Sequence, residues 1–151
     1  MKQQWRNMLV LGCVLGVVHA TLAQNISQPA TGMNDTFVYS QVMDRNGTLY
    51  AATGGLGVFV LDQSGGKTWQ PMNEGFATTI IYALAFDANE DLIAGTDEGI
   101  YRYNKALKRW TAIGNELRNR SVSTLTVTSA GAIFVATESD GLYRSNDNGA
   151  S

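Results

Sequence analysis

The stretch that decides the fold is IYALAFDANEDLIAGTDEGIY, residues 81–101. Its first six residues alternate as in a β-strand, a polar turn follows, and a second apolar run leads into a loop. A glycine, an apolar residue and an aromatic residue then begin a third run at Gly99. The pattern predicts short antiparallel strands joined by tight turns.

Two other stretches align with this one. They are VYSQVMDRNGTLYAATGGLGVF, residues 38–59, and VSTLTVTSAGAIFVATESDGLY, residues 122–143. The glycines that begin the third run, Gly57, Gly99 and Gly141, are spaced by 42 residues both times. A period of about 40–45 residues with several strand-like runs is typical of β-propeller blades.

We therefore predict an all-β fold made of about three four-stranded antiparallel propeller blades that form an incomplete ring. The blades are expected at residues 36–76, 77–118 and 119–151, the last of them truncated. Trp69 and Trp110 recur at almost the same interval as the glycines and close the first two units. Three blades leave two open flanks, so we expect further blades of the same chain, or a second copy, to close the ring.

Details of the strands follow from the alignment. In the second unit the strands are expected at 81–86, 92–95, 100–103 and 110–113. The sequence DRNG at 44–47 predicts a type I′ hairpin turn, because Asn-Gly tolerates the positive φ angles that this turn requires.

Two kinds of side chain recur at equivalent positions in the units. The aromatic residues are Phe59, Tyr101 and Tyr143, which we expect to be packing residues. Arg102 and Arg144 also repeat at one position, which predicts a shared structural role.

The sequence SNDNGAS at 145–151 matches the pattern Ser-x-Asp-x-Gly-x-Ser/Thr-Trp up to its last residue. Residues 62–69, DQSGGKTW, carry a version with Ser in place of Asp, and the second unit keeps only Trp110. On these motifs residues 36–151 resemble the BNR/Asp-box propellers, which include sialidases, sortilin-type receptors and photosystem II assembly-factor-like proteins. The chain is also similar to two-component-regulator propellers.

The resemblance implies that residues 145–151 form a turn between the third and fourth strands of a blade. Ser145, Asp147 and Gly149 are then structural: Asp147 accepts backbone N–H bonds, and Gly149 permits the tight geometry. The alternative is that Asp147 binds calcium or a sugar. The resemblance specifies architecture more than activity, because one fold hosts many functions.

Residues 1–23 have the pattern of a signal peptide. Lys2 and Arg6 precede an apolar run at 8–18, and Thr21 and Ala23 suit a cut before the next residue. The run is shorter than the roughly 20 residues that span a bilayer. We expect a secreted or periplasmic bacterial protein with a linker at 24–35 and no stable membrane insertion of the mature segment.

Alternatives for the N-terminus are a cut after Ala20, a retained anchor, and lipidation of Cys13. Cleavage after residue 23 would remove His19 and Cys13, the only His and Cys of the chain. That loss excludes catalytic triads, zinc sites built on His or Cys, haem and iron–sulfur ligation in the mature residues. We therefore expect no cofactor and no metal.

The balance of charge limits the partners. Without Lys2 and Arg6, nine basic residues remain against thirteen acidic ones. A mildly acidic chain without a basic run disfavours nucleic acid and anionic membranes as partners.

Propeller loops between the second and third strands share one face with the loops between blades. We expect Asp97, Glu98, Glu138 and Asp140 to gather on this face, beside the loop at 54–57. They are candidate ligand-binding residues, with no catalytic residue assigned. A pair of carboxylates could also hydrolyse glycosides, and the alternative to both is that they are ordinary turn residues on a solvated rim.

Three functions are consistent with these patterns. The first is a secreted, non-catalytic propeller module that binds a protein or glycan as a scaffold or sensor. The second is a fragment of a propeller-type glycoside hydrolase, with its catalytic acids partly in blades outside this sequence. The third is the periplasmic sensor domain of a two-component regulator. A sialidase is disfavoured, because the arginines are scattered and neither proline follows an Arg-Ile-Pro-like motif.

Overall fold

The structure is a computed structural model that describes residues 32–33, 36–62 and 68–151. The expected signal peptide, most of the linker and the centre of the DQSGGKTW motif lie outside these residues. The strands are β1 (Val38–Met43), β2 (Leu49–Thr53), β3 (Val58–Leu61), β4 (Trp69–Pro71), β5 (Ile81–Phe86), β6 (Leu92–Thr96), β7 (Gly99–Asn104), β8 (Arg109–Ile113), β9 (Val122–Val127), β10 (Ile133–Thr137) and β11 (Leu142–Ser145). A short 3₁₀ helix, η1, spans Asn115–Leu117.

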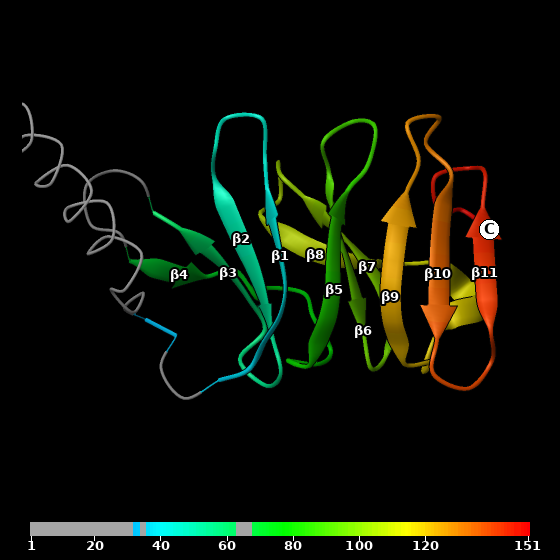
Figure 1. Cartoon of the computed structure of the whole chain (residues 1–151), viewed down its shortest axis with the longest axis horizontal. Helices are drawn as coiled ribbons and strands as arrows, with labels where there is room; N and C mark the ends of the chain where they lie inside the picture. Colours follow the sequence, from blue (N-terminus) through cyan, green and yellow to red (C-terminus); the bar gives the residue numbers. More distant parts are fainter. Residues whose placement is uncertain (1–31, 34–35, 63–67) are drawn as a thin grey trace, which may run out of the picture. The chain divides into compact units, whose positions relative to one another are not determined.

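The strands form three antiparallel sheets in which neighbours in the sequence are neighbours in space. The orders are β1-β2-β3-β4, β5-β6-β7-β8 and β9-β10-β11. The first strands of the sheets pack side by side, β1 beside β5 and β5 beside β9 (Figure 1). This is the arrangement of propeller blades, and it confirms the predicted all-β, propeller-like fold. We call the three sheets the first, second and third blades.

The repeat is visible in the strand register. Phe59 pairs with Ala51, Tyr101 with Ala94, and Tyr143 with Val135. Phe59 and Tyr101 are buried and Tyr143 is partly buried, so all three pack against the sheets as expected. The register of these pairs is the same in the three blades. A slip of one residue would turn the aromatic side chains to the opposite face of the sheet.

The turn at 44–47 differs from the predicted type I′ geometry. Gly47 has a φ of 83°, but Asn46 does not share its left-handed conformation, and type I′ requires both. The Asp44 carboxylate fixes the turn instead: its Oδ1 accepts the backbone N–H of Asn46 at 2.9 Å and of Thr48 at 2.8 Å. The predicted hairpin is confirmed, because β1 and β2 pair antiparallel across this turn. Only the predicted turn type was wrong, because the Asp44 side chain bonds its own turn.

Trp110 of β8 is the largest side chain in the core between the first and second blades. It is 1% exposed and stacks on Phe76, with ring centroids 4.5 Å apart. Its indole N–H donates to the Met72 carbonyl at 2.6 Å, and its backbone N–H donates to the Glu74 backbone carbonyl at 2.7 Å. Because residues 72–76 leave the first blade, these contacts fasten the second blade to the first.

A second apolar cluster fills the space between the second and third blades. Ile93, Val122 and Ile133 are fully buried in it. Gly95 of β6 faces Val122 and Leu125 of β9 so closely that a Cβ at this position would overlap the Val122 side chain. The small residue therefore lets the two blades approach each other.

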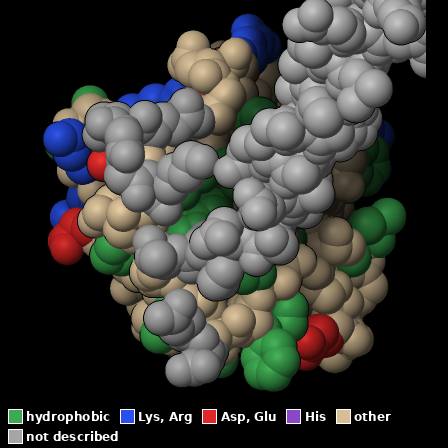
Figure 2. Space-filling model, turned by 60° about the vertical axis from the view of Figure 1, so that its left-hand side comes forward, with side chains coloured by type: hydrophobic (Ala, Val, Ile, Leu, Met, Phe, Trp, Pro, Cys, Tyr) green, Lys and Arg blue, Asp and Glu red, His purple; other side chains and the backbone are tan. Residues whose placement is uncertain are grey.

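The first blade also presents apolar side chains to solvent. Phe37, Val38, Tyr39 and Met43 belong to β1 or directly precede it, and all are exposed. Figure 2, in which the side of the first blade is turned forward, shows hydrophobic side chains at the surface among polar atoms.

Trp110→Ala should lower the free energy of unfolding by about 3–5 kcal/mol, because the indole leaves a cavity between two blades. Trp110→Phe should cost less, since it keeps a ring and loses the hydrogen bond to Met72. Urea unfolding followed by far-UV circular dichroism measures both. Leu107→Ala, at a position 66% exposed, is the control and should change little. An alanine variant of Trp110 as stable as that control would contradict this role for the indole.

Candidate functional site

The blades have two distinct ends. Turns between the first and second strands of each blade lie at one end, together with residues 145–151, and we call it the turn end (Figure 1). Loops between the second and third strands lie at the other end with the segments that join the blades, residues 72–80 and 114–121. We call this the loop end.

A backbone hydrogen bond repeats in all three loops of the loop end. It joins the residue that follows the second strand of a blade to the residue that directly precedes the first strand of the same blade. The pairs are Gly54 N–H to Phe37 O at 2.9 Å, Asp97 N–H to Ile80 O at 3.4 Å, and Glu138 N–H to Ser121 O at 3.0 Å. Each of the three bonds spans 17 residues of the sequence, so the same connection recurs once per blade.

A threonine at the end of each second strand closes the loop that follows. The hydroxyls of Thr53, Thr96 and Thr137 donate to the carbonyls of Gly57, Gly99 and Gly141 at 2.8–3.0 Å. Each hydroxyl also accepts a backbone N–H from its loop, at 3.0–3.1 Å. These threonines were not among the candidate residues, although the alignment gave a signal for them, because a threonine directly precedes the loop in each of the three aligned stretches.

The four candidate ligand-binding residues lie in two of these loops. Asp97 and Glu98 belong to the β6–β7 loop, and Glu138 and Asp140 to the β10–β11 loop. Glu98, Glu138 and Asp140 are exposed, and Asp97 is half-buried. The structure therefore places all four at the loop end, on neighbouring blades.

Asp140 is held by Arg120, which was not among the candidate residues. The Asp140 Oδ2 lies 2.5 Å from Nη1 of Arg120 and accepts the Ser139 hydroxyl at 3.1 Å. The hydrogen bond from Arg120, with help from Ser139, lowers the pKa of Asp140 below its usual value. Arg120 also lies over the Tyr143 ring, 5.7 Å from its centroid. Asp140 therefore stays ionised and serves as an anchor for Arg120.

Asp97 differs from the other three because its Oδ1 is buried. No hydrogen-bond partner contacts this oxygen among the residues that the structure describes. A buried carboxylate oxygen ordinarily takes a hydrogen bond from protein, water or ligand. Asp97 Oδ1 therefore lacks the hydrogen bond that a buried carboxylate oxygen ordinarily accepts.

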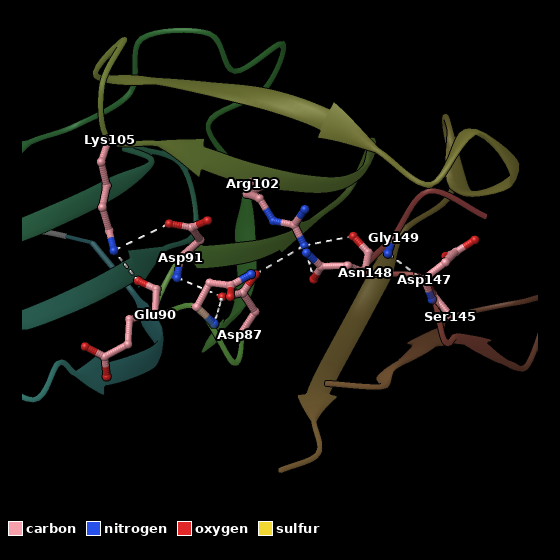
Figure 3. Close-up of polar contacts among 10 residues, drawn as sticks. Asp87, Glu90, Asp91, Arg102, Lys105, Ser145, Asp147, Asn148 and Gly149 are labelled. Atoms are coloured by element: carbon pink, nitrogen blue, oxygen red, sulfur yellow. Dashed lines mark hydrogen bonds and ion pairs between the residues drawn. The ribbon is translucent and has the colours of Figure 1, made fainter. Parts of the chain in front are cut away.

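Arg102 of β7 links the second blade to the third at the turn end (Figure 3). Its Nη2 donates to the backbone carbonyl and the Oδ1 of Asn148, at 2.9 and 2.6 Å. The same nitrogen lies 3.4 Å from Oδ2 of Asp87, whose side chain is 1% exposed. Buried ion pairs with added hydrogen bonds fix geometry more than they add stability.

Arg102 and Arg144 share a register position, opposite Ile93 and Phe134 respectively, as the alignment predicted. Their contacts differ, since Arg144 lies over the ring of Phe134 at 5.5 Å. The shared position is confirmed, and the shared structural role stays a prediction.

Asp147 lies at the centre of the turn formed by residues 145–151. Its Oδ1 accepts the Ser145 hydroxyl at 2.6 Å and the Ser151 backbone N–H at 3.0 Å, and its Oδ2 accepts the Ser151 hydroxyl. Gly149, with a φ of 82°, donates its N–H to the Ser145 hydroxyl at 2.8 Å. Hydrogen bonds from Ser145 and then Ser151 hold the pKa of Asp147 far below its usual range.

The described residues hold neither a metal-ligand cluster nor a membrane-spanning helix. Within 32–33, 36–62 and 68–151, no three His, Cys, Asp or Glu side chains gather so that they could hold a metal ion. In the same ranges no helix is both long and apolar enough to cross a membrane.

No family model matches this chain, and no curated protein matches it. Solved structures of similar fold do exist. One is the extracellular domain of the candidate one-component system BT4673 from B. thetaiotaomicron, with 26% identity and a TM-score of 0.61 over 80% of this chain. YCF48 bound to a D1 peptide has 18% identity and a TM-score of 0.63 over 82% of this chain.

The WD40 β-propeller domain of Doa1 has 17% identity and a TM-score of 0.59 over 78% of the chain. The chain spans 17% of the BT4673 structure, 41% of YCF48 and 39% of Doa1. These similarities define the chain as a segment of β-propeller fold.

Thr96→Val should lower the free energy of unfolding by about 1–3 kcal/mol, because it leaves buried partners of the hydroxyl unpaired. Thr137→Val breaks the same two bonds at a half-buried position and should cost less. Denaturant unfolding of both variants measures the difference. Equal losses would show that burial of the hydroxyl does not determine its contribution.

Asp147→Asn should change how stability depends on pH. A carboxyl with a lowered pKa stabilises the folded state above its unfolded pKa, about 3.9, and this contribution is lost as pH falls through the folded pKa. The wild-type advantage in Tm over Asp147→Asn should therefore be constant above about pH 5 and shrink below about pH 4. Thermal scans between pH 2 and 7 measure it, with Glu138→Gln as the control. A difference independent of pH would contradict the assignment.

Proposed function

We propose that this chain is part of an extracytoplasmic β-propeller that binds a polypeptide ligand at its loop end and catalyses no reaction. The observation that carries the proposal is the combination of a constant loop frame with variable loop tips. The acidic charge of the loop tips and the ionised state of Asp140 favour the same function.

The frame is the same in three successive loops. Each carries the backbone bond back to the start of its blade and the threonine bonds that close the loop. The side chains on this frame differ: GGL at 54–56, DE at 97–98 and ESD at 138–140. Rigid scaffolds that carry variable loops are a common design for recognition surfaces.

The exposed charges of the loop end are mainly acidic. Glu98, Glu138, Glu116 and Glu74 are all exposed in its loops and linkers. Arg118 is exposed, whereas Arg120 is engaged by Asp140. A surface of this sign attracts partners that present Lys or Arg side chains, both during encounter and in the complex.

The state of Asp140 supports binding over glycoside hydrolysis. A hydrolase of that kind needs one carboxyl that stays protonated as the general acid, usually through a raised pKa. The contact with Arg120 acts in the opposite direction, because it lowers the pKa of Asp140.

A sensor role is the second candidate. It is favoured by the 26% identity to the extracellular domain of a candidate one-component system. The apolar N-terminal pattern at 8–18 is consistent with export in both cases. We propose residues 1–23 as a signal peptide, 24–35 as a linker, and membership of the BNR/Asp-box group of propellers.

The test uses displayed nine-residue peptides of known charge, together with a glycan array. We expect the chain to select peptides with net positive charge. Glu98→Gln combined with Glu138→Gln should weaken that binding at least about fivefold, since it removes two charges from the loop end. The matched control is Ala88→Lys with Ala130→Lys, which changes net charge equally at exposed positions of the turn end and should leave Kd unchanged.

Equal effects of the two double variants would contradict a site at the loop end. Binding to glycans alone would replace the polypeptide ligand by a sugar. Release of reducing sugar from a polysaccharide would identify a hydrolase and overturn the proposal.

A further inference from the structure

A cavity of about 310 Å³ lies at the turn end, between the first and second blades. Three aromatic rings line it: Tyr50 of β2, Phe86 of β5 and Tyr103 of β7. Tyr50 and Phe86 lie edge to face, with ring centroids 5.7 Å apart. The volume is at the lower end of the range of about 300–1,000 Å³ that pockets for small ligands occupy. This cavity is at the opposite end of the blades from the loop tips used for the proposed function.

Three charged residues also line the cavity: Asp44, Glu90 and Lys105. Two ion pairs, each with one member in this lining, are Glu90–Arg45 at 2.5 Å and Lys105–Asp91 at 3.4 Å. Among the residues that the structure describes, Asp44 is in no ion pair, and its Oδ2 accepts one long hydrogen bond, from the Tyr50 hydroxyl at 3.4 Å. The Asp44 carboxylate therefore gives the cavity a negative charge that no cation of the lining balances.

Asp44 has an equivalent in the second blade, Asp87. Oδ1 of Asp87 accepts the backbone N–H of Asn89 at 2.9 Å and that of Asp91 at 2.8 Å. Oδ1 of Asp44 accepts the two corresponding N–H groups of its own turn at the same two distances. The two carboxylates are thus held in the same way, and in each of them Oδ2 is directed to a partner other than the turn backbone.

In the second blade that partner is a guanidinium group. Nη2 of Arg102 lies 3.4 Å from Oδ2 of Asp87 (Figure 3). Arg102 stands opposite Ile93 in the pairing of β6 with β7, and the corresponding pair in the first blade is Val60 opposite Tyr50. Val60 is half-buried and uncharged. The first blade therefore has the carboxylate of this pair without the guanidinium.

The aromatic lining favours a guanidinium over an ammonium ion as the group that balances Asp44. A guanidinium is planar, stacks on aromatic faces and is more weakly hydrated than an ammonium, so it loses less hydration energy in a cavity lined by rings. Its N–H groups also suit a carboxylate oxygen, because charge-assisted hydrogen bonds of this kind are strong. The cavity thus combines the two partners that bind guanidinium groups in proteins, a carboxylate and aromatic rings.

We propose that this cavity binds the guanidinium group of a ligand, which takes the place in the first blade that the Arg102 side chain takes in the second. The N–H groups of the ligand donate to Oδ2 of Asp44, and its plane lies against the tyrosine rings of the lining. The site is independent of ligand binding at the loop end. The guanidinium belongs either to a free small molecule or to an arginine side chain of a polypeptide.

The experiment titrates methylguanidinium chloride into the ¹⁵N-labelled full chain at constant ionic strength and follows the backbone amide shifts. Methylammonium chloride is the matched probe. Methylguanidinium should shift the amides of Asn46, Tyr50 and Tyr103 saturably, with a Kd at least about threefold lower than that of methylammonium. Equal Kd values for the two ions would overturn the proposal. So would shifts confined to the loop end, at Glu98 and Glu138, which would support the proposed function alone.

Variants of the cavity locate the probe. Asp44→Asn keeps an oxygen for the turn N–H groups and removes the charge, so the Kd of methylguanidinium should rise at least about tenfold. Val60→Arg supplies a guanidinium from the chain itself and should abolish binding. Ala130→Lys, exposed in the third blade, changes the net charge as Asp44→Asn does and should leave Kd unchanged. An unchanged Kd in either cavity variant, shown to be folded by far-UV circular dichroism, would overturn the proposal.

Two further probes distinguish the sources of the guanidinium. N-acetyl-arginine methylamide presents the group on a peptide backbone, and butylguanidinium presents it on a carbon chain alone. Tighter binding of the arginine derivative would identify an arginine side chain as the ligand, and tighter binding of butylguanidinium would identify a free small molecule. Binding of neither probe would overturn the proposal, because the site would then admit no guanidinium on a longer chain.

Discussion

The structure depends on one constraint: a four-stranded antiparallel sheet of this size cannot cover both of its apolar faces, so each blade must pack against the next. Trp110 shows how the constraint is met, since its indole is buried between β8 and the segment that leaves the first blade. Gly95 meets it in the opposite way, by having no side chain where β9 approaches. A large side chain thus fills one interface between blades, and the lack of a side chain permits close approach at the other, as close packing requires.

Packing between blades fixes the loop end as well. The segments that join the blades form hydrogen bonds with the loops beside them. For example, the Gly57 N–H of the first loop donates to the Thr79 carbonyl of the joining segment. The Asn73 side chain adds two more bonds, to the backbone of Val58 and Leu56. The loop tips are therefore displayed on a backbone held from both sides. A rigid display of this kind lowers the entropic cost of binding.

The fold was predictable because its signal is periodic. The repeat predicted strands at 92–95 and 100–103, and the structure has Leu92–Thr96 and Gly99–Asn104. The placement of the four acidic residues at one end followed from the same repeat. The contacts of Asp140 and Arg102 did not follow from the repeat, because their partners, Arg120 and Asn148, lie 20 and 46 residues away and each contact occurs once among the described residues. Patterns within a repeat predict backbone geometry, whereas contacts that occur once depend on tertiary packing.

The equal span of the loop-end hydrogen bonds has a consequence for how such a chain evolves. Each backbone bond closes within the first half of its own repeat, and each threonine bond closes within its own loop. A gene segment of one repeat length therefore encodes the complete loop frame of a blade. Tandem duplication or loss of that segment changes the number of blades without disturbing the frame of any other blade, and mutation can then diversify the tips of each copy separately.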